Sequence, residues 1–293
     1  MPRKAFLEIT NVCNLRCAFC PGTDRKPAFM PFSVFETLLP KLEGYAEYLY
    51  FHLMGEPLLH PELPRMIARA RERGFRPMLT TNGTLLGERG AELSSGALHK
   101  VSISMHAFYD GTLHYAGETA RGMTLEDYCL PCFRFARAAA ENGTIAVFRL
   151  WNLEDGVSDG RNDAVLALLA EAFPGEWRKN RSGFCLAERI FLECGERFSW
   201  PDLTAPDHGK TGFCYGLRDQ IGILCDGTVV PCCLDRNGLM ALGNLRNSAL
   251  SDILSSERAK RMVDGFTGRR TEEELCRHCG YRVRFRETRA PHS

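Results

Sequence analysis

The chain has 293 residues, of which 25% are charged, and a net charge of +1. This length allows one large domain plus a smaller one, and the balanced charge predicts no binding to nucleic acid or to acidic membranes. The sequence contains no signal-peptide core and no apolar run of membrane length. We therefore expect a cytoplasmic protein whose 13 cysteines are reduced, a setting in which clustered thiols indicate metal binding or catalysis.

Short apolar stretches alternate with amphipathic ones over the first two-thirds of the chain. The predicted strands cover residues 5–10, 45–53, 76–80, 99–105 and 144–151. The predicted helices cover residues 32–42, 61–73, 85–96, 124–141 and 165–173. Such alternation with short connections predicts an α/β fold, in which a parallel sheet has its helices outside.

The pattern changes at about residue 174, where glycine, proline and polar residues interrupt it. Residues 201–211 are predicted as a loop. Asp226-Gly227 between two apolar runs is typical of a hairpin turn. The elements predicted after the loop are strands 220–224 and 228–230 and helices 249–256 and 258–264.

Three cysteines, Cys13, Cys17 and Cys20, directly follow the first predicted strand. Thiols this close in a loop favour a metal site over three buried thiols or a partial zinc site. An iron–sulfur cluster normally takes four thiolates, so three would leave one iron open, as catalytic zinc sites keep an open position. The carboxyl end of a strand is also where such folds place their chemistry.

With Phe19 before the last cysteine, this Cys-x3-Cys-x2-Cys run resembles the radical SAM superfamily. The resemblance implies a partial (β/α)6 TIM-like barrel and a [4Fe–4S] cluster held by the three cysteines. It also implies that the open iron chelates S-adenosylmethionine (SAM), whose reductive cleavage gives a 5′-deoxyadenosyl radical. That chemistry belongs to the cofactor, which the protein orients and shields from water. An electron donor such as flavodoxin or ferredoxin is implied as a partner.

The resemblance extends to residues that would bind SAM. Gly55, Glu56 and Pro57 follow the second predicted strand, in the place of the family's GGEP-like motif, and are expected to bind the methionine amino group. Met54 stands where many members have glycine. Ser104, at the end of the fourth strand, lies where relatives contact the ribose or the carboxylate, and a local hydrogen bond is the alternative.

Arg149 is a charged residue within an apolar predicted strand. A buried arginine needs an anionic partner, and either the SAM carboxylate or an internal ion pair would serve. His106 and Asn152 are weaker candidates for the same pocket. Residues 80–84 resemble the family's Thr-Asn-Gly turn and are expected to shape that pocket.

A second set of cysteines, Cys214, Cys232, Cys276 and Cys279, lies near the C-terminus. Four ligands from three segments would close a small domain around one metal centre. Residues 226–233 and 242–245 with the final Cys-x2-Cys resemble SPASM/twitch domains, which implies one auxiliary [4Fe–4S] cluster. Cys233 could replace Cys232 as a ligand, and four thiolates also suit zinc.

We therefore expect three parts: a barrel over 1–175, a connecting segment over 176–211 and an auxiliary-cluster domain over 212–293. The remaining thiols are interpreted as buried or helical; they are Cys129, Cys132, Cys185, Cys194 and Cys225.

The expected activity is hydrogen abstraction from a small-molecule or peptide substrate, most simply for oxidation or dehydrogenation. A maturase or epimerase of ribosomal peptides is the alternative, with Cys225 or Cys233 returning a hydrogen. A structural zinc or iron–sulfur module and a cluster carrier are the readings outside this enzyme class. No obvious leader-peptide domain is present, which favours a small molecule.

Overall fold

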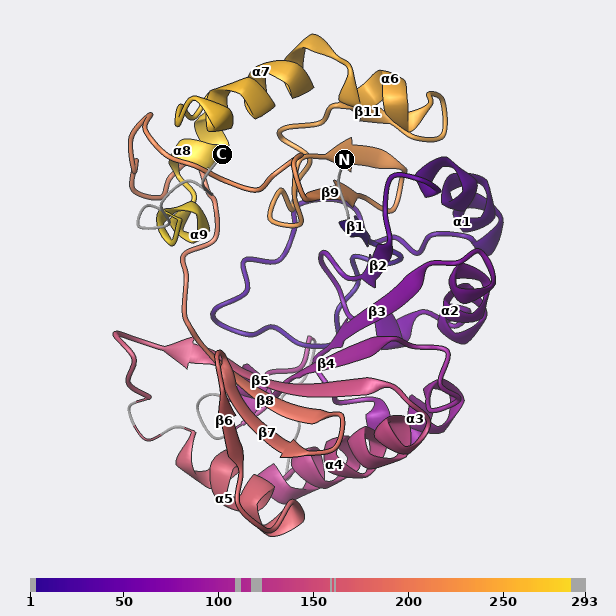
Figure 1. The fold of residues 1–293 in the computed structure, drawn as a ribbon, viewed down its shortest axis with the longest axis vertical. Coiled ribbons are helices and arrows are strands. Elements are labelled where there is room, and N and C mark those ends of the chain that lie inside the picture. The colour runs from indigo at the N-terminus through magenta and orange to yellow at the C-terminus, as the bar shows by residue number, and fades with distance from the viewer. Residues whose placement is uncertain (1–3, 109–111, 117–122, 159, 161, 286–293) are drawn as a thin grey trace.

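The computed structural model describes residues 4–108, 112–116, 123–158, 160 and 162–285, and its centre is one open sheet (Figure 1). The strand order is β11-β10-β9-β1-β2-β3-β4-β5-β8-β7-β6, so β11 and β6 form the edges. The parallel strands are β1 (Lys4–Leu7), β2 (Tyr48–Phe51), β3 (Arg76–Thr81), β4 (Lys100–Ser104), β5 (Ile145–Leu153), β8 (Ile190–Glu196) and β9 (Gln220–Ile223). The expected α/β class and open, barrel-like sheet are confirmed.

Helices between the strands cover one face of the sheet (Figure 1). They are α1 (Phe32–Leu38), α2 (Leu63–Glu72), α3 (Leu86–Leu93), α4 (Leu125–Glu141) and α5 (Asp163–Ala172). Short 3-10 turns are η1 (Leu39–Leu42), η2 (Pro57–Leu59) and η3 (Met105–Phe108). Each helix thus lies at or near its predicted position.

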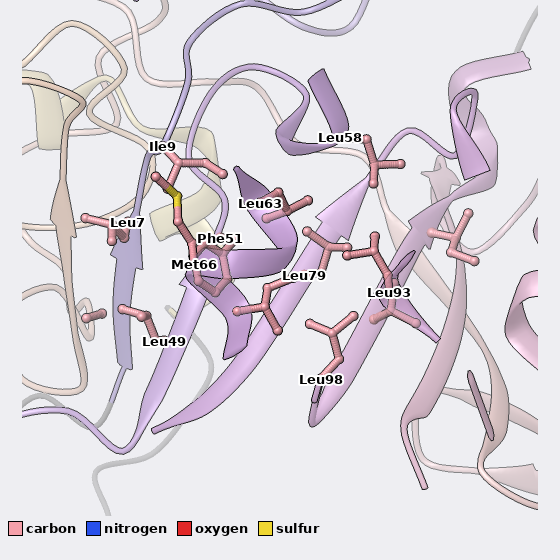
Figure 2. Packing of buried hydrophobic residues seen from close by; sticks show 14 of the residues in the cluster. Leu7, Ile9, Leu49, Phe51, Leu58, Leu63, Met66, Leu79, Leu93 and Leu98 are labelled. Atoms are coloured by element: carbon pink, nitrogen blue, oxygen red, sulfur yellow. The ribbon is translucent and has the colours of Figure 1, made fainter. Parts of the chain in front are cut away.

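The core lies between these helices and the sheet. Leu49 and Phe51 of β2 are fully buried and point toward Met66 of α2 (Figure 2). Side chains alternate along a strand, so the intervening residues Tyr50 and His52 lie on the opposite face. We call that face, turned away from α1–α5, the inner face. Tyr50, His52 and Arg149 on this face are only partly buried, which leaves this part of the face available for a site.

Residues 176–211, expected to be a connection, contain three strands that the sequence analysis missed. These are β6 (Arg178–Asn180), β7 (Gly183–Ala187) and β8, and β8 pairs with β5 in parallel. The sheet therefore continues beyond residue 175. The missed strands hold polar and small residues on the inner face, such as Glu193 and Gly195, so no continuous apolar run marks them.

The predicted hairpin forms, and it extends the same sheet. β9 pairs with β1, and β10 (Thr228–Val230) pairs with β9 and with β11 (Gly243–Asn244). The helices that follow are α6 (Leu250–Leu254), α7 (Glu257–Thr267), α8 (Glu274–Arg277) and α9 (Gly280–Val283); in Figure 1, α6 and α7 lie above the hairpin and α8 and α9 lie to its left.

Candidate active site and cluster-binding thiols

The cysteine loop after β1 is held over the end of β4. Leu15 forms an antiparallel bridge with Tyr115, and the Ala116 N–H donates to the Asn14 carbonyl at 2.8 Å. The Phe19 ring lies 5.0 Å from the ring of His106. The loop that carries the three thiols is therefore fixed at the carboxyl edge of the parallel strands.

None of the three cysteines of this loop forms a disulfide, and Cys13 and Cys20 interact electrostatically. Burial raises the pKa of Cys13 to about 11, and the nearby Glu56 and Cys20 act in the same direction. The Leu15 N–H, 3.4 Å from the Cys13 sulfur, opposes this. Such a thiol loses its proton only when a cation compensates the charge, so the loop fits an iron centre.

The turn Gly55-Glu56-Pro57 packs directly on this loop. Gly55 has φ +77°, and a Cβ there would lie 2.4 Å from the carbonyl oxygen of Thr10. The Glu56 N–H donates to the Val12 carbonyl at 2.8 Å. Only glycine fits this position, because both the backbone conformation and the close approach exclude a side chain.

The Glu56 side chain is buried and connects β2 to β3. Its carboxylate accepts hydrogen bonds from the Thr81 hydroxyl at 2.7 Å, the Asn82 N–H at 2.7 Å and the Leu58 N–H at 3.0 Å. Burial raises the pKa of Glu56 to about 7, although these three donors lower it. Through these three hydrogen bonds Glu56 supports the turn itself.

Asn82 extends the same network to the cysteine loop. Its side-chain N–H groups donate to Asn14 Oδ1 at 2.9 Å and approach the Cys13 sulfur at 3.9 Å. The Tyr128 hydroxyl, from α4, lies 2.7 and 3.0 Å from the carbonyl oxygens of Asn82 and Ser104, which share its single proton. Sequence reasoning missed Asn14 and Tyr128, whose roles depend on long-range contacts.

Arg149 lies on the inner face and forms an internal ion pair, which is one of the two alternatives that the sequence left open. Its Nε is 3.2 Å from the Glu193 carboxylate, which is also 3.2 Å from Lys100 Nζ. The Arg149 guanidinium carbon is 4.6 Å from the Trp151 ring centroid. Sequence reasoning missed Glu193 and Lys100 because β8 itself was missed.

The other inner-face candidates differ in their partners. His106 Nδ1 lies 3.1 Å from the Arg149 carbonyl oxygen. Burial, with Arg149 acting in the same direction, lowers the pKa of His52 to about 4. Asn152 pairs with Asn162 through two side-chain hydrogen bonds of 2.7 and 3.0 Å, so its amide is already used.

The C-terminal region brings together five thiols rather than four. Burial raises the pKa of Cys232, and repulsion from Cys233, Cys214 and Cys276 adds to it. Burial also raises the pKa of Cys233 to about 12, with Cys214 and Cys279 contributing. All five are free thiols, and their mutual repulsion in a buried cluster fits a cationic iron centre.

One buried arginine holds the segment around this thiol set. Arg282 is 1% exposed, and its guanidinium donates to the carbonyls of Cys276, Thr211 and Gly209 at 2.9, 2.9 and 3.0 Å. In the ranges that the structure describes, no three His, Cys, Asp or Glu side chains surround a single metal-ion position. The thiolates of an iron–sulfur cluster lie further apart than the ligands of a single metal ion, so they need not form a single-ion site. The cysteine ligands of the two clusters therefore stay a prediction.

The structure has two sets of cysteine thiols. One lies at the carboxyl edge of an open parallel sheet and the other lies beside the hairpin that extends this sheet, and together they define a metallocofactor protein. Comparison with known families agrees. The radical SAM superfamily profile matches residues 7–150, and the SPASM profile, an iron–sulfur cluster-binding domain, matches residues 214–280. The chain belongs to the radical SAM superfamily and carries a SPASM domain. Its cofactors are [4Fe–4S] clusters and SAM.

Sequence relatives match part of the chain. A tungsten-containing aldehyde ferredoxin oxidoreductase cofactor-modifying protein of Pyrococcus furiosus is 36% identical over 34% of this chain and 30% of its own length. A GTP 3′,8-cyclase of Xanthomonas axonopodis pv. citri is 29% identical over 67% of this chain and 57% of its own length. The chain thus matches less than a third of the length of the first relative and less than three-fifths of the second.

Solved structures match nearly the whole chain. BtrN in complex with AdoMet and 2-DOIA has a TM-score of 0.57 at 18% identity, covering 95% of this chain and 93% of BtrN. The anSMEcpe structure with bound AdoMet has a TM-score of 0.62 at 14% identity, covering 98% and 88%. These similarities establish the fold. Over its described residues, the chain has no helix both long and apolar enough to span a membrane.

Proposed function

We propose that this radical SAM enzyme oxidises a polar substrate bound on the inner face of its sheet. The observation that carries the proposal is the position of the C-terminal thiols. Cys233 packs against the buried cluster that contains Leu53 and Met54, the residues directly after the inner-face residue His52. Burial raises the pKa of Tyr50, another inner-face residue, and the charges of Tyr48, Cys233 and Glu193 act in the same direction. The C-terminal thiols therefore lie beside the inner face, and we propose that the centre they hold accepts an electron from a substrate there.

When bound, the cofactors supply a 5′-deoxyadenosyl radical that takes a hydrogen atom and an auxiliary cluster that accepts the remaining electron. We assign the first cluster to Cys13, Cys17 and Cys20, and the second to Cys214, Cys232, Cys276 and Cys279 within residues 212–293. Gly55, Glu56 and Pro57 would orient the amino group of SAM, with Phe19 and Ser104 beside it. The proposed domain division assigns residues 1–175 to the barrel and 176–211 to the connection, whose strands β6, β7 and β8 extend the barrel sheet.

The inner face supports a polar substrate. Lys100 and Arg149 flank one carboxylate, Glu193, so the trio carries one net positive charge that a substrate anion can balance, and its charged groups can form hydrogen bonds with a substrate hydroxyl. His52 is neutral at neutral pH because burial lowers its pKa to about 4, and a neutral imidazole can accept a hydroxyl proton. Arg149, for which the sequence analysis expected either the SAM carboxylate or an internal ion pair, would then contact this substrate or the SAM carboxylate.

A second candidate is modification of a peptide, including epimerisation. The solved relatives include SuiB of Streptococcus suis bound to the precursor peptide SuiA and anSMEcpe bound to the Cp18Cys peptide. Cys233 is the better hydrogen donor of the two thiols considered, because Cys225 is 8% exposed and lies next to Glu8, away from the thiol set. Either reaction needs an external one-electron donor of the flavodoxin or ferredoxin type.

Product mass separates these two reactions. The holoenzyme would be incubated in D2O with dithionite, SAM and either polyhydroxylated small molecules or short peptides. Oxidation predicts a product lighter by two hydrogens for each 5′-deoxyadenosine formed. A product of unchanged composition that gains one deuterium from solvent would instead establish epimerisation and contradict the proposed oxidation.

A further inference from the structure

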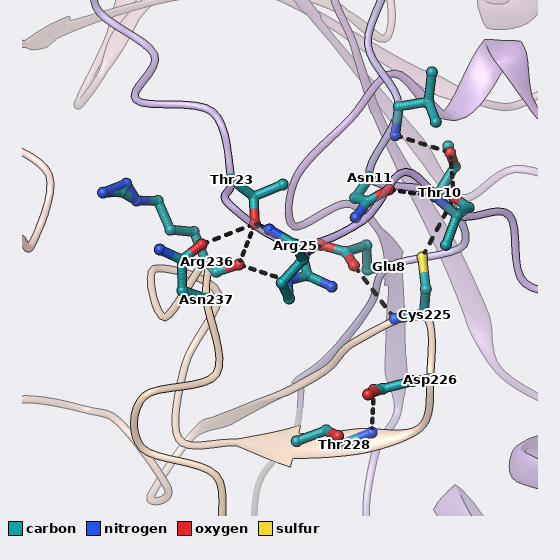
Figure 3. A network of polar contacts seen from close by, with 12 residues as sticks. Glu8, Thr10, Asn11, Thr23, Arg25, Cys225, Asp226, Thr228, Arg236 and Asn237 are labelled. Atoms are coloured by element: carbon teal, nitrogen blue, oxygen red, sulfur yellow. Dashed lines mark hydrogen bonds and ion pairs between the residues drawn. The ribbon is translucent and has the colours of Figure 1, made fainter.

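The end of the cysteine loop is held by residues that directly follow the auxiliary cysteines (Figure 3). The Thr23 hydroxyl lies 2.8 Å from Asn237 Oδ1 and 3.0 Å from the Arg236 carbonyl oxygen. The Asn237 side chain also binds Asp24 twice, accepting from its N–H at 3.1 Å and donating to its carboxylate at 2.7 Å. Arg25 Nε donates to the same Arg236 carbonyl at 2.9 Å.

A buried carboxylate anchors this contact to the sheet. The Glu8 side chain is fully buried and lies 2.6 Å from Arg25 Nη2. Its other oxygen accepts from the Cys225 N–H at 3.3 Å, at the hairpin turn. The loop is therefore tied to β1 and to the β9–β10 hairpin as well as to residues 236 and 237.

The turn that presents Arg236 and Asn237 is itself rigid. Asp235 is fully buried, and its carboxylate accepts from the N–H groups of Leu239 and Met240 at 2.9 and 2.8 Å. Asp235 stands two residues after Cys233, and Thr23 stands three residues after Cys20. A short series of hydrogen-bonded residues therefore connects the N-terminal cysteine loop to the C-terminal set of cysteines.

Arg236 brings a positive charge to this contact between residues 23–25 and residues 236–237. Its side chain is 13% exposed and pairs with Asp202 at 2.7 Å, and the Asp202 side chain is 39% exposed. The Arg236 carbonyl oxygen lies 3.0 Å from the Thr23 hydroxyl, and Thr23 is three residues after Cys20, so Arg236 stands beside the segment that carries Cys20. A pocket of about 220 Å³ opens here, lined in part by Asp24, Asp202 and Asn237.

We propose that Arg236 and Asn237, although they belong to the SPASM domain, are positioning residues of the SAM-cluster site. Asn237 holds the end of the cysteine loop, and Arg236 sets the electrostatic potential at Cys20. A cation close to a cluster ligand stabilises the reduced, more negative state of the cluster, so Arg236 raises its reduction potential. The inference rests on the proposed function in one respect, namely that Cys20 is a ligand.

The test is an EPR-monitored redox titration of the holoenzyme, following the reduced-cluster signal that changes when SAM is added. Arg236→Gln should shift the midpoint of that signal to a more negative potential, and Arg236→Lys should restore most of it. Asp202→Asn, which removes the anion beside Arg236, should shift the midpoint in the opposite direction. Asn237→Ala should leave the midpoint close to the wild-type value but release iron from this cluster faster to a chelator.

Opposite shifts for Arg236→Gln and Asp202→Asn would support a charge effect, because a merely disturbed structure has no reason to reverse sign. An unchanged midpoint in Arg236→Gln, or equal shifts in the Gln and Lys variants, would overturn the proposal. The Cys20→Ala variant tests the assumption that Cys20 is a cluster ligand. If that variant keeps the SAM-sensitive signal, Cys20 is no ligand, and both the proposed ligand set and this inference fail.

Discussion

Single residues at the carboxyl edge of the sheet are fixed by contacts that only the folded chain reveals. Gly55 is required by its backbone conformation and by the carbonyl of Thr10, and Glu56 satisfies three donors at once. The motif Gly-Glu-Pro could be found from the sequence, since it follows a strand. Its dependence on Thr81 and Asn82 could not, because those residues are 25 and 26 positions away in the chain.

Gly55→Ala should destabilise the protein and disturb the cysteine loop. The left-handed conformation costs an alanine about 1–2 kcal/mol, and the clash with the Thr10 carbonyl adds to this. Gly74→Ala is the matched control, because Gly74 has φ +85° with no atom within 4 Å of the added Cβ. Urea denaturation of both variants should therefore show a larger loss of unfolding free energy for Gly55→Ala. Equal losses would mean that the close approach is unimportant.

His52 should make the protein sensitive to acid. Its pKa is lowered from 6.5 to about 4 by burial and by Arg149, so the folded chain binds fewer protons than the unfolded chain between these values. The stability it contributes is present above about pH 6.5 and is lost as the pH falls toward 4, with a slope of at most about 1.4 kcal/mol per pH unit. His52→Gln should flatten this part of the stability curve. An unchanged slope would contradict the burial of a neutral histidine.

At the scale of the elements, regular strand–helix alternation was predictable and the end of the barrel sheet was not. Helices α1–α5 and strands β1–β5 have apolar faces that mark them in the sequence. Strand β8 was not predicted because its inner face bears the charged residue Glu193. The ion pair between Arg149 and Glu193 could therefore not be predicted either. The hairpin was predictable from Asp226-Gly227, but its pairing with β1 was not, because chain order does not specify which strand a hairpin joins.

The hairpin also presents Cys232 and Cys233 together, and a matched pair of variants separates their roles. We expect Cys232→Ser to lose the auxiliary cluster and retain about four irons per chain, and Cys233→Ser to retain about eight, since each cluster holds four. Iron and acid-labile sulfide analysis of anaerobically purified protein measures this. The reverse pattern would assign the ligand to Cys233 and remove it as a hydrogen donor.

On the scale of the whole molecule, strands of one sheet lead to both sets of cysteines. Strand β1 leads into the cysteine loop, and its neighbour β9 leads through the hairpin to the auxiliary thiols. The Glu8, Arg25 and Asn237 contacts then join the two across the loop. If the proposed function holds, this arrangement would let a reaction begun at one centre be completed at the other, on a substrate bound at the inner face.

The central claim is that the three thiols of the cysteine loop hold the cluster that cleaves SAM. It is tested most directly by measuring 5′-deoxyadenosine after dithionite and SAM are added to the anaerobically purified protein. We predict that the wild-type chain forms 5′-deoxyadenosine and that Cys17→Ala forms none while it keeps the iron of the auxiliary cluster. Continued formation of 5′-deoxyadenosine by Cys17→Ala, or none by the fully iron-loaded wild type, would contradict the account.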